Sequence, residues 1–149
     1  MRKYLLFCIM FLVSMMCGCS DLSIDENNSK TSYLKNETAI IDHYNVTMSN
    51  YIVSEMWNDL NPNNGQYLIV TFKIKNNSKE DKIINLNKNY ELYIDGNLYK
   101  NMNQEQNINI SSNDEITHNL VYDVPILNTY DVLFYSGVVG NNMNFKIVL

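Results

Sequence analysis

From about residue 40 onward, apolar and polar residues alternate with a period of two, and this pattern constrains the fold more than any other feature. The clearest example is the segment 67–75. Successive side chains of a strand point to opposite faces, so this alternation predicts a strand with one buried face. No stretch shows the 3.6-residue period of an amphipathic helix. The apolar positions of the segment are Leu68, Val70, Phe72 and Ile74.

Other segments continue this alternation and are separated by turn residues. Asp95-Gly96 is the strongest hairpin motif, because glycine accepts the positive φ that a type I′ turn requires. Residues 54–65 form the longest connection, which is also compatible with a short helical turn. The predicted strands cover about residues 44–53, 67–75, 82–86, 90–94, 97–100, 115–124, 130–135 and 143–149. Seven or eight short strands with half-apolar faces predict an all-β antiparallel sandwich.

The first twenty residues have the layout of an export signal. A basic start precedes an apolar run, residues 4–16, which is too short to span a bilayer. Cys19 directly follows Gly18, and a cysteine after a small residue is typical of bacterial lipoproteins. We therefore predict a signal peptide over residues 1–18 and lipid attachment, by diacylglyceryl and palmitate groups, at Cys19. An ordinary cleaved signal peptide and a retained membrane anchor are the alternatives.

The chain is predicted to contain one domain on a tether. Residues 20 to about 39 are polar and lack an apolar period, so residues 19–41 are assigned to the lipidated cysteine and a flexible tether. The sandwich is assigned to residues 42–149, which are numerous enough to bury a core. Only one of the three cysteines, Cys19, remains after cleavage, so no disulfide forms within the mature chain.

The charge balance excludes one class of partner. After removal of the signal peptide the chain has nine lysines, no arginine and sixteen acidic residues, which gives a net charge of −7. Nucleic-acid-binding proteins need a basic patch and favour arginine for phosphate and guanine contacts. We therefore expect no nucleic-acid partner, and we expect membrane association through the lipid on Cys19 rather than through charge.

The order of these strand motifs resembles a known bacterial family. The motifs are YLIVTFKIKNNSKED, YELYIDGNLY, ITHNLVYDVP, YDVLFY and NFKIVL, between about residues 42 and 149. They are similar to the domain-of-unknown-function family 4352, although a common Pro-Gly turn is replaced here by residues 111–114. The resemblance implies an immunoglobulin-like fold, like that of a secreted mycobacterial antigen, and an exported or lipid-anchored location. It implies no catalytic residues.

The sequence lacks the residue spacings of catalytic and metal sites. His43 and His118 have no partner at a zinc-ligand spacing, and His118 is predicted to be a hydrogen-bonded histidine in or beside the core. A hydrolase using His118, Asp123 and a serine is the weakest alternative, because no Gly-x-Ser-x-Gly motif is present. Residues 58–65 contain a single carboxylate and are predicted to be a polar turn, not a calcium loop. We therefore predict no enzyme, no metal and no cofactor.

Aromatic residues in two connections are candidates for a contact surface. Trp57 lies in the 54–65 connection, and Tyr93 and Tyr99 flank the Asp95-Gly96 turn. Tyrosine and tryptophan are enriched at recognition surfaces, although packing within the sheet is the competing interpretation. The sequence thus predicts a non-catalytic recognition or accessory module, anchored to the outer side of the cell membrane, that binds a protein, peptide or glycan. A structural lipoprotein that supports an envelope complex is the alternative.

Overall fold

The computed structural model describes residues 31–103 and 107–149, in which all regular structure is β-strand. The predicted signal peptide and Cys19 lie outside these residues. Within the described ranges, no helix has the length and apolar character needed to cross a membrane. The predicted all-β class is therefore confirmed for the part of the chain that the structure describes.

The bounds of most strands agree closely with the predicted segments. Two of them, β1 and β7, were not predicted. In chain order they are β1 (Thr38–Ile41), β2 (Tyr44–Ser54), β3 (Gln66–Asn76), β4 (Lys82–Asn85), β5 (Tyr90–Ile94), β6 (Asn97–Tyr99), β7 (Asn107–Ile110), β8 (Glu115–Val124), β9 (Thr129–Tyr135) and β10 (Asn142–Val148).

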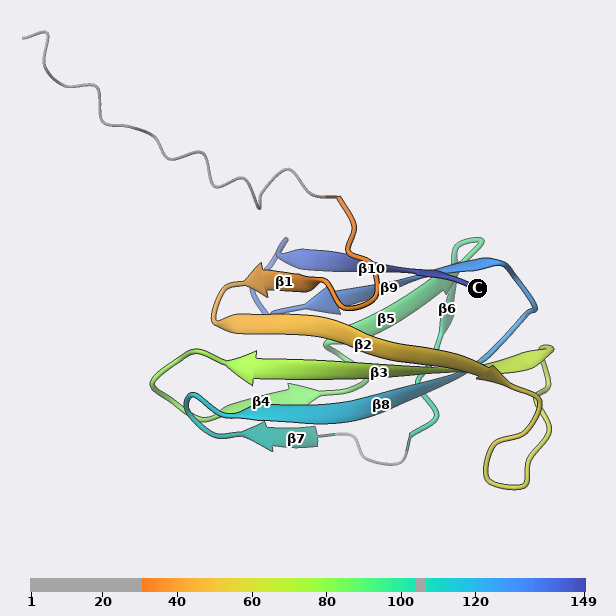
Figure 1. The fold of residues 1–149 in the computed structure, drawn as a ribbon, viewed down its shortest axis with the longest axis horizontal. Helices are drawn as coiled ribbons and strands as arrows, with labels where there is room; N and C mark the ends of the chain where they lie inside the picture. Colours follow the sequence, from red (N-terminus) through yellow and green to blue (C-terminus); the bar gives the residue numbers. More distant parts are fainter. Residues whose placement is uncertain (1–30, 104–106) are drawn as a thin grey trace, which may run out of the picture.

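The strands form two facing four-stranded sheets (Figure 1). The first sheet has the order β1-β2-β3-β8 and the second has the order β10-β9-β5-β6, while β4 and β7 form a separate two-stranded ladder. Every ladder between these strands is antiparallel. This arrangement confirms the predicted antiparallel sandwich.

The core lies between the two sheets, and strand β3 shows how the sequence builds it. Its four alternating apolar residues, from Leu68 to Ile74, are all 0% exposed, whereas Lys73 between them is exposed. The Phe72 ring lies 5.0 Å from the ring of Tyr90 and 5.1 Å from that of Phe145, both in the second sheet. The predicted face of this strand is therefore confirmed.

The sandwich begins before residue 42, contrary to the predicted end of the tether. Tyr33 is 2% exposed, and its backbone exchanges 2.8 Å hydrogen bonds with Asn144 and Lys146 of β10. Strand β1 pairs with β2 and buries Ala39 and Ile41. These apolar residues are few and lie among polar ones, so they give too short a pattern to be recognised as periodic.

Hydrogen-bonded turns fix the connections. Asp95 and Gly96 have φ values of 50° and 78°, and Ile94 pairs with Asn97, which confirms the predicted hairpin. At the start of β9, the Tyr130 hydroxyl donates to the Pro125 carbonyl at 2.7 Å and accepts the Leu127 N–H at 3.0 Å. This contact resembles the tyrosine corner of immunoglobulin-like sandwiches.

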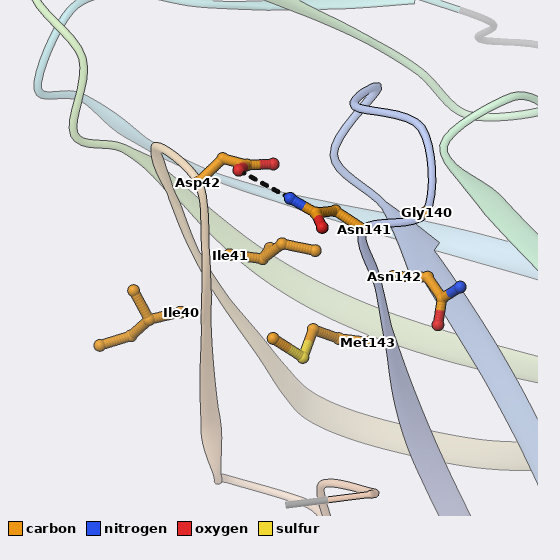
Figure 2. A pocket seen from close by; sticks show the side chains of 7 residues that line it. All are labelled: Ile40, Ile41, Asp42, Gly140, Asn141, Asn142 and Met143. Carbon is orange, nitrogen blue, oxygen red and sulfur yellow. Dashed lines mark hydrogen bonds between the residues drawn. The ribbon is translucent and has the colours of Figure 1, made fainter. Parts of the chain in front are cut away.

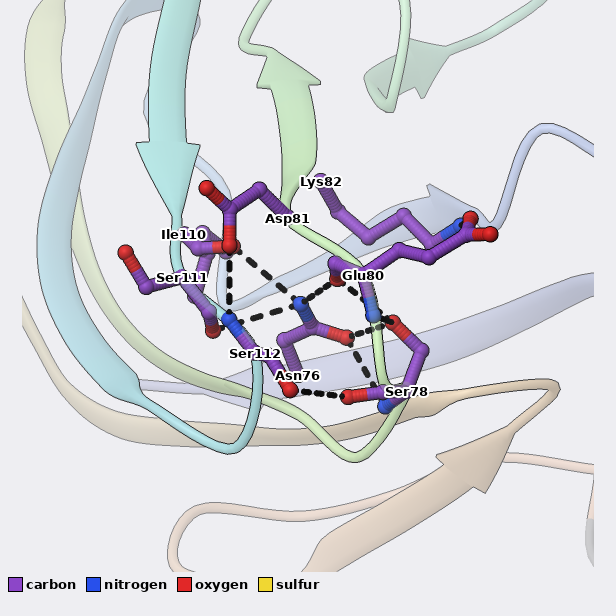
Figure 3. Close-up of polar contacts among 8 residues, drawn as sticks. All are labelled: Asn76, Ser78, Glu80, Asp81, Lys82, Ile110, Ser111 and Ser112. Atoms are coloured by element: carbon purple, nitrogen blue, oxygen red, sulfur yellow. Dashed lines mark hydrogen bonds and ion pairs between the residues drawn. The ribbon is translucent and has the colours of Figure 1, made fainter.

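At one end of the domain, Asn76 joins two connections through a buried amide (Figure 3). Its side chain is fully buried, and Nδ2 donates to three backbone carbonyls at 2.7–3.3 Å, those of Glu80, Ile110 and Ser111. Its Oδ1 accepts both the backbone N–H and the hydroxyl of Ser78. Asn76 therefore fixes the β3–β4 connection against the β7–β8 turn.

Candidate functional site

The connection between β2 and β3 contains Trp57 and is a tight turn, not a helical one. Trp57 and Leu60 exchange two backbone hydrogen bonds of 3.0 Å, and the two residues between them have φ values of 49° and 61°. Trp57 is half-buried, with its ring 6.1 Å from the ring of Tyr67. The alternative of a short helical turn in this connection is therefore wrong, because Asn58 and Asp59 adopt the left-handed conformation that suits a two-residue turn.

The second half of this connection is held against the end of β8. The Asp123 carboxylate accepts the backbone N–H groups of Asn63 and Asn64 at 2.8 and 2.9 Å. The Tyr67 hydroxyl donates to the carbonyl of Asn61 at 3.0 Å. Because both Asp123 oxygens serve backbone donors, this carboxylate orders the loop. Across the described ranges, no three His, Cys, Asp or Glu side chains are grouped closely enough to hold a metal ion.

Two connections at this end of the domain have exposed apolar side chains. Met56 and Leu60 are 54% and 55% exposed, and Ile126 of the β8–β9 connection is 73% exposed. The two connections touch, because a Cβ atom added at Gly65 would lie 3.2 Å from Ile126. Figure 1 shows both connections at the end of the sandwich that also holds the C-terminus. We call Met56, Trp57, Leu60 and Ile126 the apolar end.

The three predicted contact residues do not form one surface. Tyr93 pairs with Leu98 across the β5–β6 ladder, and both are exposed on its outer face, at 43% and 46%. Tyr99 pairs with Leu92 and packs partly buried against the core. Tyr93 and Tyr99 therefore occupy opposite faces of one hairpin, since side chains alternate along a ladder. Trp57 belongs to a connection of the other sheet.

Glu91, which the sequence did not single out, organises two tyrosines on the outer face of the second sheet. Its carboxylate lies close enough to Tyr93 and Tyr135 to act on the pKa of both hydroxyls. The charge of Glu91 raises the pKa of Tyr93, whereas burial, followed by the hydrogen bond to Glu91, raises the pKa of Tyr135 to about 12. The sequence could have indicated that Glu91 lies near Tyr93, because the alternation of β5 places both residues on one face.

A hollow of about 240 Å³ lies at the opposite end of the domain (Figure 2). The β1–β2 turn and the β9–β10 connection form it, and the Asn141 side chain donates to the Asp42 carboxylate at 3.0 Å. Ile41 and Met143 also line it. The one carboxylate in the hollow is that of Asp42, and it already accepts the hydrogen bond from Asn141. This contact links the two sheets and provides no acid–base pair.

His118 is not in a catalytic arrangement. It is 8% exposed, and its ring lies 5.2 Å from that of Tyr90 and 6.2 Å from that of Phe72. Neither ring nitrogen has a hydrogen-bond partner, and burial lowers the pKa of His118 to about 4. Asp123 is occupied by the loop backbone. The described residues thus show no hydrogen-bonded Ser-His-Asp set that includes His118. The predicted burial of this histidine is confirmed, but the predicted hydrogen bond is wrong, because neither ring nitrogen has a partner.

Comparison with solved structures identifies proteins of similar fold. The ycdA protein of Bacillus subtilis, assigned as a lipoprotein, has a TM-score of 0.56 and 17% identity over 80% of this chain, which spans 39% of that protein. The yjhA protein of Bacillus subtilis has a TM-score of 0.59 and 13% identity over 77% of this chain and 98% of its own. These identities establish similarity of fold alone.

A secreted protein of Mycobacterium tuberculosis, MPT63, has a TM-score of 0.53 and 14% identity over 81% of this chain and all of its own. No match is found among curated proteins. The sequence from residue 33 to residue 145 matches the domain of unknown function DUF4352. Because this match covers most of the chain and includes strands of both sheets, the protein belongs to the DUF4352 family.

Proposed function

We propose that this protein is an exported, lipid-anchored and non-catalytic binding module that recognises a protein partner through its apolar end. The short apolar N-terminal run that ends in Gly18-Cys19 supports export and anchoring. The similarity in fold to a secreted protein and to a protein assigned as a lipoprotein supports an exported location.

The exposure of aliphatic side chains at the apolar end carries the proposal. Met56, Leu60 and Ile126 are each more than half exposed, on two connections that contact one another. Exposed apolar residues at one end of an ordered domain are candidates for an interaction site. The hydrogen bonds that Asp123 accepts from Asn63 and Asn64 hold the second half of the loop in place, which reduces the conformational entropy lost on binding.

The chemistry of this surface favours a protein over a glycan. Glycan recognition uses exposed aromatic rings and convergent polar groups, whereas the Trp57 ring already packs against Tyr67. Aliphatic Met and Leu side chains complement an apolar patch of a protein. Sandwich domains commonly use such end loops for function, because the sheets hold them in place.

Site-specific cross-linking in intact cells tests this proposal. A photo-reactive benzophenone residue replaces Leu60 in the full-length protein, and the same residue replaces Ile83 in a matched control. Ile83 is 68% exposed on β4, outside the apolar end. We expect one discrete cross-linked product from position 60, which the additional substitutions Met56→Ser and Ile126→Ser abolish, and none from position 83.

Equal cross-linking from the two positions, or none from position 60, would contradict recognition through the apolar end. Turnover of a peptide, ester or glycan that disappears in His118→Ala, while the variant stays folded, would overturn the non-catalytic part of the proposal.

A further inference from the structure

The outer face of the second sheet has a group of aromatic, apolar and acidic side chains. Leu133 lies opposite Glu91 in the β5–β9 ladder, and Leu98 lies opposite Tyr93 in the β5–β6 ladder. Tyr135 follows Leu133 by two residues, so alternation places all five side chains on one face. Tyr93 and Leu98 are 43% and 46% exposed, and the other three are half-buried. We call these five residues the tyrosine face.

Glu91 is the only charged member of the tyrosine face and lies close to both tyrosines. The charge of Glu91 raises the pKa of the Tyr93 hydroxyl, and burial followed by Glu91 raises that of Tyr135. Among the residues that the structure describes, Lys82 and Glu80 form an ion pair, whereas Glu91 has no ion-pair partner. The tyrosine face therefore combines an unpaired carboxylate with two accessible aromatic rings.

A hollow of about 290 Å³ adjoins this carboxylate. Glu91 and Tyr135 line it together with Lys88 and the β9–β10 connection, residues 137–140. Val139 of that connection is 100% exposed, so the hollow is open to a partner. Lys88 is exposed and forms no ion pair with Glu91. The negative charge of Glu91 is therefore available to a cation that enters from outside.

We propose that the tyrosine face binds an arginine side chain of a partner protein. A guanidinium group is planar, pairs with a carboxylate through two parallel hydrogen bonds and stacks on aromatic rings. An ion pair with an accessible carboxylate contributes little alone, whereas Tyr93 and Tyr135 add cation–π contacts. Leu98 and Leu133 offer apolar surface to the methylene groups of the arginine.

The composition of the chain indicates where this arginine comes from. The chain has one arginine, Arg2, which lies in the predicted signal peptide, so a second mature copy cannot supply the ligand. The net charge of −5 favours the approach of a basic partner. This inference goes beyond the proposed function and does not depend on it, because the apolar end uses other residues.

A titration followed by backbone amide NMR tests the proposal. Full-length protein in a nonionic detergent is titrated with acetyl-Gly-Arg-Gly-amide and, separately, with the same peptide containing citrulline, the neutral isostere of arginine. We expect saturable shifts of the Glu91, Tyr93 and Leu133 signals with the arginine peptide, and no change at Lys73, which is exposed on the first sheet. The citrulline peptide should bind about tenfold more weakly or less, because hydrogen bonds between charged groups are strong.

Two substitutions that remove the same charge locate the site. Glu91→Gln keeps the size of the side chain and should weaken binding of the arginine peptide about tenfold. Asp131→Asn is the matched control on the same face, since Asp131 lies opposite Lys146 and accepts a 2.9 Å hydrogen bond from Asn144. Affinity in this control should stay within about twofold of the wild type.

Four outcomes would overturn the proposal. The first is no saturable shift at the tyrosine face, and the second is equal binding of the arginine and citrulline peptides. The third is equal weakening in Glu91→Gln and Asp131→Asn, which would indicate attraction to the net charge alone. The fourth is equally tight binding of the corresponding lysine peptide, which would remove the assignment to arginine. None of these results affects the cross-linking test of the apolar end.

Discussion

At the scale of single residues, asparagine and aspartate have two structural roles in this protein. Within the described ranges, every non-glycine residue with positive φ is one of these two types, which tolerate the left-handed conformation. They are Asn36, Asp42, Asn58, Asp59, Asp95 and Asn113. Asn76 has the other role, since its buried amide joins two connections. Asparagine therefore serves both turn formation and internal bridging in this fold.

Replacement of Asn76 by alanine should be strongly destabilising. The change removes the Asn76 donor from the carbonyls of Glu80, Ile110 and Ser111. The Glu80 carbonyl keeps the Ser78 hydroxyl and the Ser111 carbonyl keeps the Asp114 N–H, whereas a buried group left unpaired costs about 1–3 kcal/mol. We expect Asn76→Ala to lower the free energy of unfolding by about 3 kcal/mol in urea denaturation. Asn77→Ala is the control and should change it by less than about 0.5 kcal/mol, because Asn77 is exposed. Similar losses in both variants would contradict the bridging role of Asn76.

His118 should make the fold sensitive to acid. Burial lowers the pKa of His118 to about 4, from the usual 6.5 that applies in the unfolded chain. Between these values the unfolded chain binds the proton more tightly, so the free energy of unfolding falls as the pH falls from about 6.5 to 4. The full loss is about 3 kcal/mol, and above about pH 7 this residue contributes no pH dependence. Urea denaturation at several pH values measures how the free energy of unfolding depends on pH. Between pH 6.5 and 5 this free energy should change less steeply with pH in His118→Leu than in the wild type. Equal steepness in the two proteins would contradict this role of His118.

At the scale of elements, eight of the ten strands could be predicted because each repeats its alternation or adjoins a clear turn. Strands β1 and β7 have four residues each and two apolar side chains or fewer on a buried face, which is too little to establish a period. The register shift between Met48 and Asn50 in β2 was also not predicted. It depends on pairing with β3, which the local sequence does not specify.

The same limit applies to the candidate site. The Asp95-Gly96 turn was predictable from two residues, and the burial of His118 was predictable from the alternation of its strand. The contacts of Asp123 with Asn63 and Asn64 join residues about 60 positions apart. Sequence periodicity contains no information on such pairs. For this reason Glu91, whose role depends on tertiary contacts, was missed.

Strand β3 offers the sharpest test of an element. Phe72 is fully buried between the sheets and Lys73 is exposed. Phe72→Ala should lower the free energy of unfolding by about 3–5 kcal/mol, the usual range for a buried phenylalanine. Lys73→Ala should change it by less than about 0.5 kcal/mol. Equal effects in chemical denaturation would show that the face of this strand is assigned incorrectly.

At the scale of the whole molecule, the N-terminal segment connects the two sheets. Tyr33 bonds to β10 of the second sheet, whereas β1 pairs with β2 of the first. The Tyr33 ring also lies 5.8 Å from the ring of Phe145. The segment that sequence analysis assigned to the tether therefore closes one side of the sandwich.

A truncation measures this contribution. A chain that starts at residue 42 loses the buried side chains of Tyr33, Ala39 and Ile41. Because each large apolar side chain contributes about 1.5–3 kcal/mol on burial, we expect it to be about 3 kcal/mol less stable than a chain that starts at residue 31. Thermal and urea unfolding of the two chains make the comparison. Equal stability would mean that residues 31–41 are dispensable and that the sandwich begins at residue 42 after all.

The anchoring of the whole molecule depends on Cys19 in the proposed function. Lipid attachment needs the thiol that follows Gly18, so Cys19→Ser should abolish incorporation of an alkyne-labelled fatty acid and leave the longer precursor in cells. Cys17→Ser is the matched control, because Cys17 lies only two residues earlier and follows bulky methionines. We expect it to retain both labelling and processing. Loss of label in Cys17→Ser, with normal labelling of Cys19→Ser, would assign the anchor to Cys17 and lengthen the mature chain by two residues.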